Sequence, residues 1–199
     1  MTTKQKQAKL DDISRSIIER KVDIDIAKTC LNPVPGEGDA DAKLMFIGEA
    51  PGAQEDKLGR PFVGASGKFL AEMLEDMGMA REEVYITNIV KFRPPNNRDP
   101  RKEEIEACLP YLIEQIKVIQ PKLVIFLGRH SMNVFFPELK IGQAHGQAVK
   151  KTVKFGPDQK LEQVFLPLYH PAAALYNGSM RKVLQEDFNK IPKILELIK

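Results

Sequence analysis

The segment LMFIGEAPGAQED, residues 44–56, runs from an apolar stretch into a loop that is richer in glycine and acid than an ordinary turn requires. The apolar residues 43–47 are typical of a strand that is covered on both faces. Comparable runs follow at residues 84–90, 123–127 and 164–168, with helical patterns between them. Strands of this kind that alternate with helices predict an α/β fold, a three-layer α/β/α sandwich around a central, mostly parallel sheet of four strands.

Helical spacing of apolar residues predicts the covering layers. We expect helices from Leu10 to Ile18, over residues 66–77, over residues 100–120, from Gly128 through Phe135, and over residues 180–198. Residues 1–8 are polar and are expected to form a disordered tail. The chain of 199 residues is predicted to be a single domain, 1–199, without repeats or low-complexity linkers.

The composition is that of an ordinary globular protein, with 43% hydrophobic and 29% charged residues. A net charge of +3 permits contact with nucleic acid, but only over a local surface. The two cysteines, Cys30 and Cys108, are too few for a disulfide framework or a four-thiolate metal site, which favours a reducing compartment. No signal peptide or membrane span is evident, so a cytoplasmic protein is expected.

Ligands of parallel α/β sheets bind beyond the carboxyl ends of the strands. Three polar features fall at such ends: the loop of residues 48–64, Asn88 within VYITNIV, and Tyr169-His170-Pro171. The sequence contains no nucleophile elbow, no Walker lysine and no G-x-G-x-x-G. Serine-hydrolase, P-loop and dinucleotide-binding functions therefore lack their required parts.

The loop GEAPGAQEDKLGRPFVG, residues 48–64, combines glycines that allow close backbone approach with two prolines that stiffen it. Phe62 is either a core residue beneath the loop or a platform on which a flat ring stacks. Glu49, Glu55 and Asp56 are either solvated or capping acids, or groups of the site. Their spacing matches no zinc or calcium motif, and no metal site is predicted.

The second loop, KFRPPNNRDP at residues 91–100, follows Asn88. An amide at a buried strand end must be hydrogen-bonded, and it either bonds loop backbone or reads the edge of a ligand. Lys91, Arg93 and Arg98 suit a phosphate-facing surface, although a basic loop is often only solvated. Asn97 either orients a water or serves turn formation.

His170 is the histidine that the sheet topology favours for function, because it lies at the same edge as Asn88 and the glycine loop. His130 at a helix start is expected to be a surface or capping residue, and nothing near His145 favours a function. From the residues alone, we predict a pocket for a planar polar ligand.

Four segments, in order, carry a resemblance to a known family: VPGEG, GEAPGAQEDKLGRPFVGASGKFL, ITNIVKFRPPNNRDP with EIEACLPYL, and YHPAAALYN. Together they resemble the uracil-DNA glycosylase superfamily, most closely its family 4, over about residues 34–190. The resemblance implies DNA repair by excision of uracil from a flipped nucleotide.

By this resemblance, Asn88 pairs with N3–H and O4 of uracil, a pattern that cytosine cannot satisfy. Phe62 stacks on the base, and backbone amides of the loop that holds Ala50 and Gly52 bind it. Glu55 lies near the C5 side, where it excludes the methyl group of thymine.

The resemblance also assigns catalysis. His170 donates a hydrogen bond to O2 of the departing uracil. The best-known family of the superfamily has an aspartate where this chain has Ala50, so Asn97 would position the water and Glu49 would hold the geometry of the site.

DNA contacts follow by the same resemblance. Ser66, Lys68, Arg93 and Arg98 would contact phosphates. Residues 169–177, with Pro171 and Ala172, would enter the minor groove.

Family 4 members usually carry a [4Fe-4S] cluster on four cysteines. Aligned on VPGEG and on the proline loop, these positions fall near Lys21 and Ile24, at Phe92 and at Cys108. A single thiolate cannot hold a cluster. We therefore predict that the cluster is absent and that Ile24 and Phe92 fill its place by apolar packing.

The sequence thus predicts a monofunctional uracil-DNA glycosylase without cofactor. It would be a monomer acting on single- or double-stranded uracil-containing DNA, with nucleoid-associated activity and free uracil as product. The alternatives are a glycosylase for hypoxanthine or xanthine and a catalytically silent DNA-binding member of the superfamily.

Overall fold

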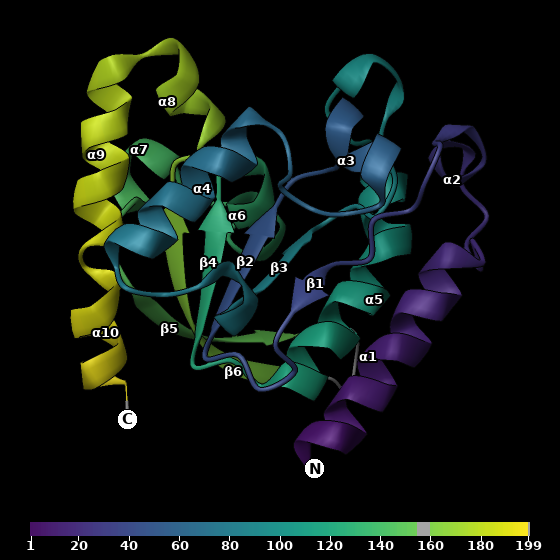
Figure 1. The fold of residues 1–199 in the computed structure, drawn as a ribbon, viewed down its shortest axis with the longest axis horizontal. Coiled ribbons are helices and arrows are strands. Elements are labelled where there is room, and N and C mark those ends of the chain that lie inside the picture. The colour runs from purple at the N-terminus through teal and green to yellow at the C-terminus, as the bar shows by residue number, and fades with distance from the viewer. Residues whose placement is uncertain (155–159, 199) are drawn as a thin grey trace.

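A computed structural model describes residues 1–154 and 160–198. The described residues form a six-stranded sheet of order β1-β3-β2-β4-β6-β5 (Figure 1). Its four inner strands run parallel to one another. They are β3 (Tyr85–Asn88), β2 (Leu44–Gly48), β4 (Leu123–Leu127) and β6 (Lys160–Leu168). The mostly parallel α/β sheet is confirmed.

The predicted number of four strands is wrong, because two antiparallel strands close the edges of the sheet. β1 comprises only Glu37–Gly38, and β5 (Val149–Lys154) is rich in lysine and half exposed. An edge strand needs backbone pairing but no apolar face, and its charges protect the sheet from further pairing. A search for apolar runs therefore misses both.

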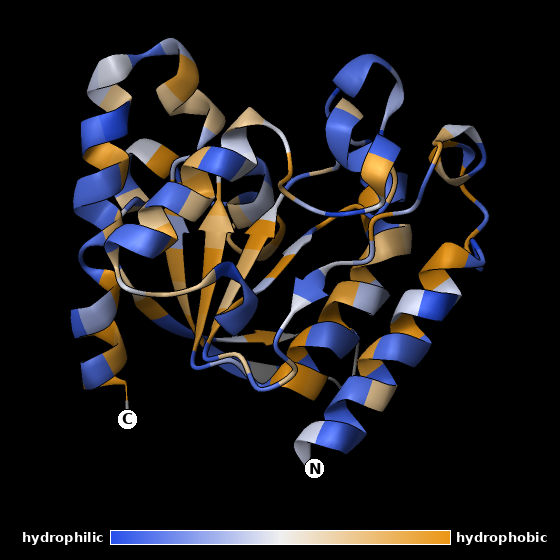
Figure 2. Ribbon diagram, in the orientation of Figure 1, coloured by the Kyte–Doolittle hydropathy of each residue, from blue (hydrophilic) through white to orange (hydrophobic). Residues whose placement is uncertain are grey.

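The two faces of the sheet bury alternate residues against separate helix layers. Leu44, Phe46 and Ile125 pack with α4 (Ala65–Asp76), α9 (Gly178–Phe188) and α10 (Ile191–Leu197). Met45 and Phe126 pack on the other face with α1 (Thr3–Ile18), α5 (Lys102–Ile119) and α6 (Arg129–Phe135). The strands are apolar throughout, whereas helices such as α1 carry blue outer stripes (Figure 2). The predicted three-layer sandwich is confirmed.

The remaining elements are short and connect these layers. They are α2 (Asp25–Thr29), α3 (Ala53–Leu58), η1 (Arg81–Glu83), η2 (Pro95–Asn97), α7 (Ile141–Ala144) and α8 (Ala172–Tyr176). Helices α3, η2 and α8 follow the carboxyl ends of β2, β3 and β6. These connections gather at the edge of the sheet that the sequence marks as the site. Within the described residues, no helix has the length and apolar character that a membrane span requires.

Two expectations about the ends of the chain need correction. Residues 3–8, expected in a disordered tail, lie in α1, which a capping box of Thr2 and Gln5 starts. Lys6 joins this turn to the end of α5 by donating to the carbonyl of Ile119 at 2.9 Å. The single helix expected over residues 180–198 is two helices, because Pro192 has no N–H with which to continue α9.

Candidate active site

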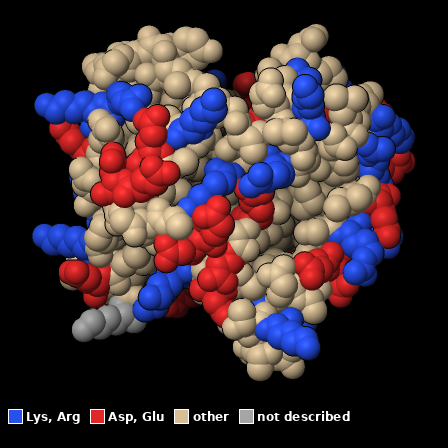
Figure 3. All heavy atoms as spheres, viewed as in Figure 1, with Lys and Arg blue, Asp and Glu red and all other residues tan. Residues whose placement is uncertain are grey.

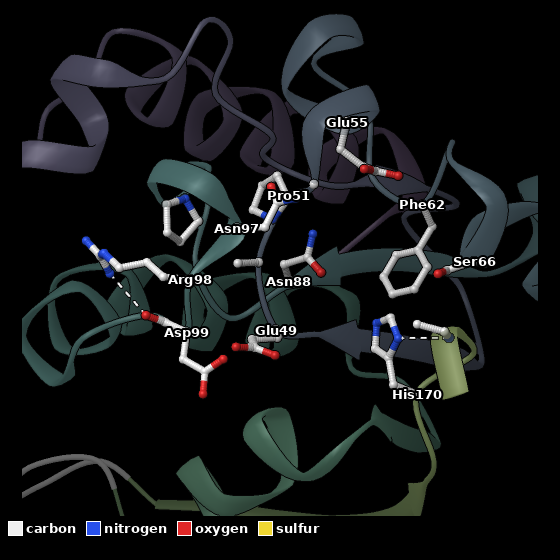
Figure 4. A pocket seen from close by; sticks show the side chains of 14 residues that line it. Glu49, Pro51, Glu55, Phe62, Ser66, Asn88, Asn97, Arg98, Asp99 and His170 are labelled. Atoms are coloured by element: carbon white, nitrogen blue, oxygen red, sulfur yellow. Dashed lines mark hydrogen bonds between the residues drawn. The ribbon is translucent and has the colours of Figure 1, made fainter. Parts of the chain in front are cut away.

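A cavity of about 370 Å³ opens at the carboxyl ends of β2 and β3, a volume usual for small-ligand pockets. In the space-filling view of Figure 3, a notch between the surfaces over α8 and α3 marks this end of the molecule. Residues from all three predicted loops line the cavity (Figure 4). The lining consists of Glu49, Ala50, Pro51, Gly52, Glu55, Phe62, Ser66, Asn88, Pro94, Asn97, Arg98, Asp99, His170 and Ala172.

Asn88, the last residue of β3, contributes the amide at the floor of the cavity. The residue is 2% exposed, and no hydrogen bond of its side chain is found among the described residues; because none of their fully buried side-chain N or O atoms lacks a partner, the amide atoms are open to the cavity. Backbone pairing continues past it, because the N–H groups of Ile89 and Val90 donate to the carbonyls of Gly48 and Glu49. A rigid strand end therefore presents a buried amide whose donor and acceptor remain for a ligand.

Phe62 lies beside this amide, and two glycines make room for it. A Cβ on Gly48 would collide with Asn88 Oδ1 and lie 2.7 Å from the Phe62 ring. A Cβ on Gly67, in the first turn of α4, would overlap the Phe62 carbonyl. Phe62 is 6% exposed and belongs to a core cluster, yet its ring also lines the cavity. Phe62 is therefore a core residue whose ring is also part of the cavity wall, and its stacking on a ligand stays a prediction.

The loop that carries Phe62 is held from two sides. The Glu55 carboxylate accepts hydrogen bonds from the N–H groups of Val63 at 2.9 Å and Gly64 at 2.8 Å. The Arg81 guanidinium donates to the carbonyls of Pro61 and Phe62. These contacts hold Phe62 at a φ of 49°, a left-handed conformation that is unfavourable for a bulky residue. Glu55 thus fastens the loop while it lines the cavity.

His170 lies beside Phe62, with its ring centroid 5.6 Å from that of Phe62 (Figure 4). The N–H of Ala172 donates to His170 Nδ1 at 3.1 Å, so the proton of the neutral ring sits on Nε2. Burial lowers the pKa of His170 to about 4, while the charge of Glu55 opposes that effect. The imidazole is therefore neutral at physiological pH and has one N–H donor.

Glu49 follows β2 and reaches the cavity beside two groups that the sequence did not single out. Its Oε1 lies 3.9 Å from His130 Nδ1, and His130 Nε2 lies 3.5 Å from Asp99 Oδ2. Burial raises the pKa of Glu49, and the neighbouring His130 opposes this. The ligand atoms of these three side chains lie within 4.8 Å of one another, so they could hold a metal together.

The proline loop brings Asn97 and Arg98 to the rim of the cavity. Asn97 has a φ of 53°, and its Oδ1 accepts a hydrogen bond from Arg93 Nε at 2.8 Å. Arg98 forms a two-pronged ion pair with Glu104, at 2.6 and 2.9 Å. The guanidinium of Arg98, expected at a phosphate, is therefore engaged by the first turn of α5.

The remaining predicted DNA contacts surround the cavity. Ser66 lines it at the start of α4, whereas Lys68 is exposed one residue beyond Gly67. Pro171 is buried and precedes α8, of which Ala172 is the first residue. The cavity therefore brings together Ser66 and Ala172, but not Lys68, Arg93 or Pro171.

One residue of the proline loop contradicts the sequence interpretation. Lys91, expected on a phosphate-facing or solvated surface, is completely buried. Its Nζ donates to Thr87, Asn88 and Gln115 at 2.6–2.8 Å. The sequence also did not single out Pro51, which follows Glu49 in the same loop and lines the cavity. His130, Pro94 and Asp99 reach Glu49 or the cavity only because separate loops fold together.

The four positions at which the resemblance expects cluster cysteines do not fit an iron–sulfur cluster. Phe92 and Cys108 are 0% exposed and share one core cluster, against which Ile24 packs. Burial raises the pKa of the Cys108 thiol, the opposite of what a metal-binding thiolate requires. Among the described residues, no group of three or more cysteines, histidines or acids gathers there.

The fold and the cavity agree with the comparisons to known proteins. The model of the family described as "Uracil DNA glycosylase superfamily" matches residues 35–195, and the chain belongs to that superfamily. A type-4 uracil-DNA glycosylase of Sulfurisphaera tokodaii is 52% identical over 167 residues, 82% of this chain and 74% of its own. A type-4 enzyme of Archaeoglobus fulgidus is 45% identical over 191 residues, 93% of this chain and 92% of its own.

Similarity to uracil-DNA glycosylases of another type covers less of the chain. A type-5 uracil-DNA glycosylase of Thermus thermophilus is 35% identical over 112 residues, 49% of this chain and 51% of its own. Within the superfamily, the chain therefore belongs with the type-4 uracil-DNA glycosylases.

Proposed function

We propose that this chain is a monofunctional uracil-DNA glycosylase that hydrolyses the N-glycosidic bond of uracil in DNA. It releases free uracil and leaves an abasic site, the first step of base excision repair. The observation that carries this proposal is the convergence of Asn88, Phe62 and a neutral His170 in one cavity. The type-4 relatives, named for the same activity, support it.

Recognition begins when the nucleotide leaves the duplex and the base enters the cavity. In the side-chain amide of Asn88, the oxygen accepts a hydrogen bond from uracil N3–H and the NH₂ group donates one to uracil O4. Cytosine has an acceptor at N3 and a donor at C4, so both contacts would be repulsive. The rigid position of Asn88 at the end of β3 makes this mismatch costly, since the amide cannot rotate freely beside Gly48 and Phe62.

The remaining walls fix the plane and the orientation of the base. Phe62 stacks on the ring, held by the contacts of its loop with Glu55 and Arg81. Backbone amides of the loop that includes Ala50 and Gly52 bind the base from the side of β2. Glu55 lies toward the C5 edge, where the methyl group of thymine would collide with it.

His170 stabilises the leaving group. As the C1′–N1 bond breaks, negative charge develops on the uracil ring and a positive charge on the sugar. His170 Nε2–H donates to O2, where part of the negative charge gathers. The low pKa keeps this donor neutral and unchanged above pH 5, so it needs no proton from solvent.

Glu49 activates the water that attacks the sugar. The oxygen of water bonds to C1′, Glu49 takes the proton that water loses, and the uracil anion leaves. A pKa raised by burial makes Glu49 a better base than an exposed carboxylate. Asn97, oriented by Arg93, helps to position the same water from the rim of the cavity.

The surface around the cavity receives the DNA. Ser66 and Lys68 at the start of α4, together with Arg93, contact phosphates, whereas Arg98 stays paired with Glu104. Pro171, Ala172 and the residues up to Asn177 enter the minor groove, where Leu175 and Tyr176 expose 42% and 91% of their surface. The face in Figure 3 mixes positive and negative groups, which suits a local rather than an extended contact.

The enzyme acts as a single-domain monomer without an iron–sulfur cluster or another cofactor. Packing of Phe92, Cys108 and Ile24 takes the place of a cluster. The chemistry needs none, because leaving-group stabilisation and water activation come from side chains.

Release of free uracil from defined oligonucleotides tests the function. The substrates carry uracil opposite guanine, opposite adenine and in a single strand. Matched strands with hypoxanthine, xanthine, cytosine or thymine serve as controls. We expect uracil release, followed by alkali-sensitive strand cleavage at the abasic site, and no release of cytosine or thymine. Binding of uracil-containing DNA without release of a base would instead identify a silent member.

A further inference from the structure

Lys91 is a lysine in the interior of the protein, three residues beyond the amide that faces the cavity. Its side chain is 0% exposed. Nζ donates to Thr87 Oγ1 at 2.6 Å, to the backbone carbonyl of Asn88 at 2.8 Å and to Gln115 Oε1 at 2.8 Å. No carboxylate of the described residues forms an ion pair with it. This cation is therefore bound by neutral oxygens alone.

Each of the three oxygens that face Lys91 Nζ can only accept a hydrogen bond. The Thr87 hydroxyl donates its own proton to the carbonyl of Pro35 at 2.9 Å. The Gln115 amide nitrogen donates to the same carbonyl at 2.9 Å and to the Tyr85 hydroxyl at 3.2 Å. An ammonium has three N–H donors for three acceptors, whereas a neutral amine has only two. The arrangement therefore matches the charged form.

A buried ammonium at this position is unfavourable for stability, so its hydrogen bonds must serve a purpose that offsets this cost. Burial lowers the pKa of Lys91 to about 7, which reflects the desolvation of the ammonium. A methionine would fill the same space in the core without that cost. Methionine, however, cannot donate a hydrogen bond to the backbone carbonyl of Asn88.

The carbonyl of Asn88 matters because the Asn88 side chain lacks an anchor of its own. Its amide opens into the cavity and forms no hydrogen bond with the described residues, so packing and the backbone orient it before a base arrives. β3 ends at Asn88, and the chain then turns into the proline loop. Lys91 ties this strand end to Gln115 in the middle of α5, and thereby to the largest helix of the fold.

We propose that Lys91 is a positioning residue for base recognition: its buried ammonium fixes the peptide of Asn88 and so the direction of the amide that reads uracil. The inference rests on the proposed function, because it assigns the reading of uracil to Asn88. It adds a residue that never touches the substrate to the determinants of specificity.

The test compares Lys91→Met with Tyr85→Phe. Lys91→Met keeps the volume and removes the donors, whereas Tyr85→Phe alters the same network beyond Gln115 and leaves Nζ untouched. We expect kcat/KM for uracil release to fall about 10- to 100-fold in Lys91→Met, because small displacements of a recognition group cost this much. Inhibition by free uracil should weaken in parallel. Tyr85→Phe should stay within about threefold of the parent protein, because the Tyr85 hydroxyl contacts Gln115 and bonds neither Lys91 nor Asn88.

A double-mutant cycle with Asn88→Ala separates positioning from general damage. If Lys91 acts through Asn88, Lys91→Met has little further effect in the Asn88→Ala background. If the two losses multiply, Lys91 acts elsewhere and the proposal is wrong. Activity of the parent protein on uracil-containing DNA reports the proposed function separately, so the two failures are distinguishable.

Two further measurements apply should Lys91→Met not fold. Lys91→Gln retains an N–H donor and should lose less activity than removal of Asn88. In the parent protein labelled with ¹⁵N-lysine, free uracil should shift the buried ammonium resonance, and Asn88→Ala should abolish that shift. An unshifted resonance in the presence of bound uracil would overturn the proposal.

Discussion

The base pocket and the region around Cys108 approach each other along the chain between Asn88 and Phe92, yet they differ from the family pattern in opposite ways. At the pocket, the chain has Phe62, Asn88 and His170, to which the resemblance assigns contacts with the base, although Ala50 stands where the best-known family of the superfamily has an aspartate. Four residues beyond Asn88, Phe92 occupies a position expected to hold a cluster cysteine, and only Cys108 remains of four.

The difference indicates which task each region performs. Hydrogen-bond donors aimed at a base have no apolar substitute, whereas a structural tie between segments has several. Here Tyr111 of α5 donates to the carbonyl of Lys21 at 3.1 Å, and Ile24 packs against the core that holds Phe92. A hydrogen bond and apolar packing thus join this segment to α5, and we propose that they do so in place of a cluster.

The largest loss of turnover should come from a substitution in the pocket. His170→Ala removes the donor to the departing uracil, so we expect kcat to fall about 100- to 1000-fold, equivalent to about 3–4 kcal/mol of transition-state stabilisation. Single-turnover release of uracil measures it. The melting temperature should change little, because His170 is a lining residue rather than a core residue.

His145→Ala is the matched control for that measurement. His145 bonds Asp187 at 2.6 Å and does not line the cavity, so its loss should affect stability more than turnover. Full activity of His170→Ala would disprove the proposed mechanism even if uracil release is confirmed.

Glu49 should give the next largest effect, together with a pH dependence. Because burial raises its pKa, Glu49 takes up a proton at a higher pH than an ordinary glutamate. Turnover should therefore fall as the pH is lowered through that raised pKa. His170, with a pKa of about 4, remains neutral over most of this range, so the acid limb belongs to Glu49.

Glu49→Gln should abolish the acid limb and lower kcat about 100-fold at neutral pH. Asn97→Ala serves as the comparison: it should slow the reaction less and keep the limb, because Asn97 only positions the water. An unchanged acid limb in Glu49→Gln would assign water activation to another group.

The sequence predicts the inner sheet well because buried parallel strands are almost continuously apolar. It does not predict β1 or β5, since EG and VKKTVK pair at the edges through backbone alone. The start of α1 was missed for a similar reason: its stability comes from the Thr2 cap and from contact with α5, not from apolar periodicity.

Within the site, the motif residues at strand ends could be located from the sequence because topology brings those ends together. The environment of a charged residue could not be predicted from the sequence. Lys91 sits in a basic, proline-rich loop and reads as solvated, but Gln115, 24 residues further on, accepts its hydrogen bond inside the core. His130 likewise lies beside Glu49 and Asp99 only because two separate loops bring these residues together.

Substitutions in the Cys108 region should lower the stability of the protein and leave turnover nearly unchanged, the opposite of what we expect for the pocket. Phe92→Ala opens a cavity in a packed core and should cost about 3–5 kcal/mol in the free energy of unfolding. For a chain of this size, that is a fall of roughly 10 °C in the melting temperature. Uracil release measured well below that temperature should stay within about threefold of the parent protein. A large loss of turnover without loss of stability would couple the region to the chemistry and break the comparison.

The smallest effect is expected from removal of metal and of the last cluster-type cysteine. One thiolate cannot hold a [4Fe-4S] cluster, and Cys30 is engaged elsewhere, near the carbonyl of Ala27 and the guanidinium of Arg20. Chelation should therefore leave the melting temperature and turnover unchanged, with iron and sulfide far below one cluster per chain. Cys108→Ala should cost only about 1–2 kcal/mol of stability, the consequence of a small void in the core. In a cluster-bearing protein the same substitution would remove a ligand and unfold the segment around it. Stoichiometric iron, or loss of folding in Cys108→Ala, would show that this region still depends on a metal and that packing by Phe92 does not replace it.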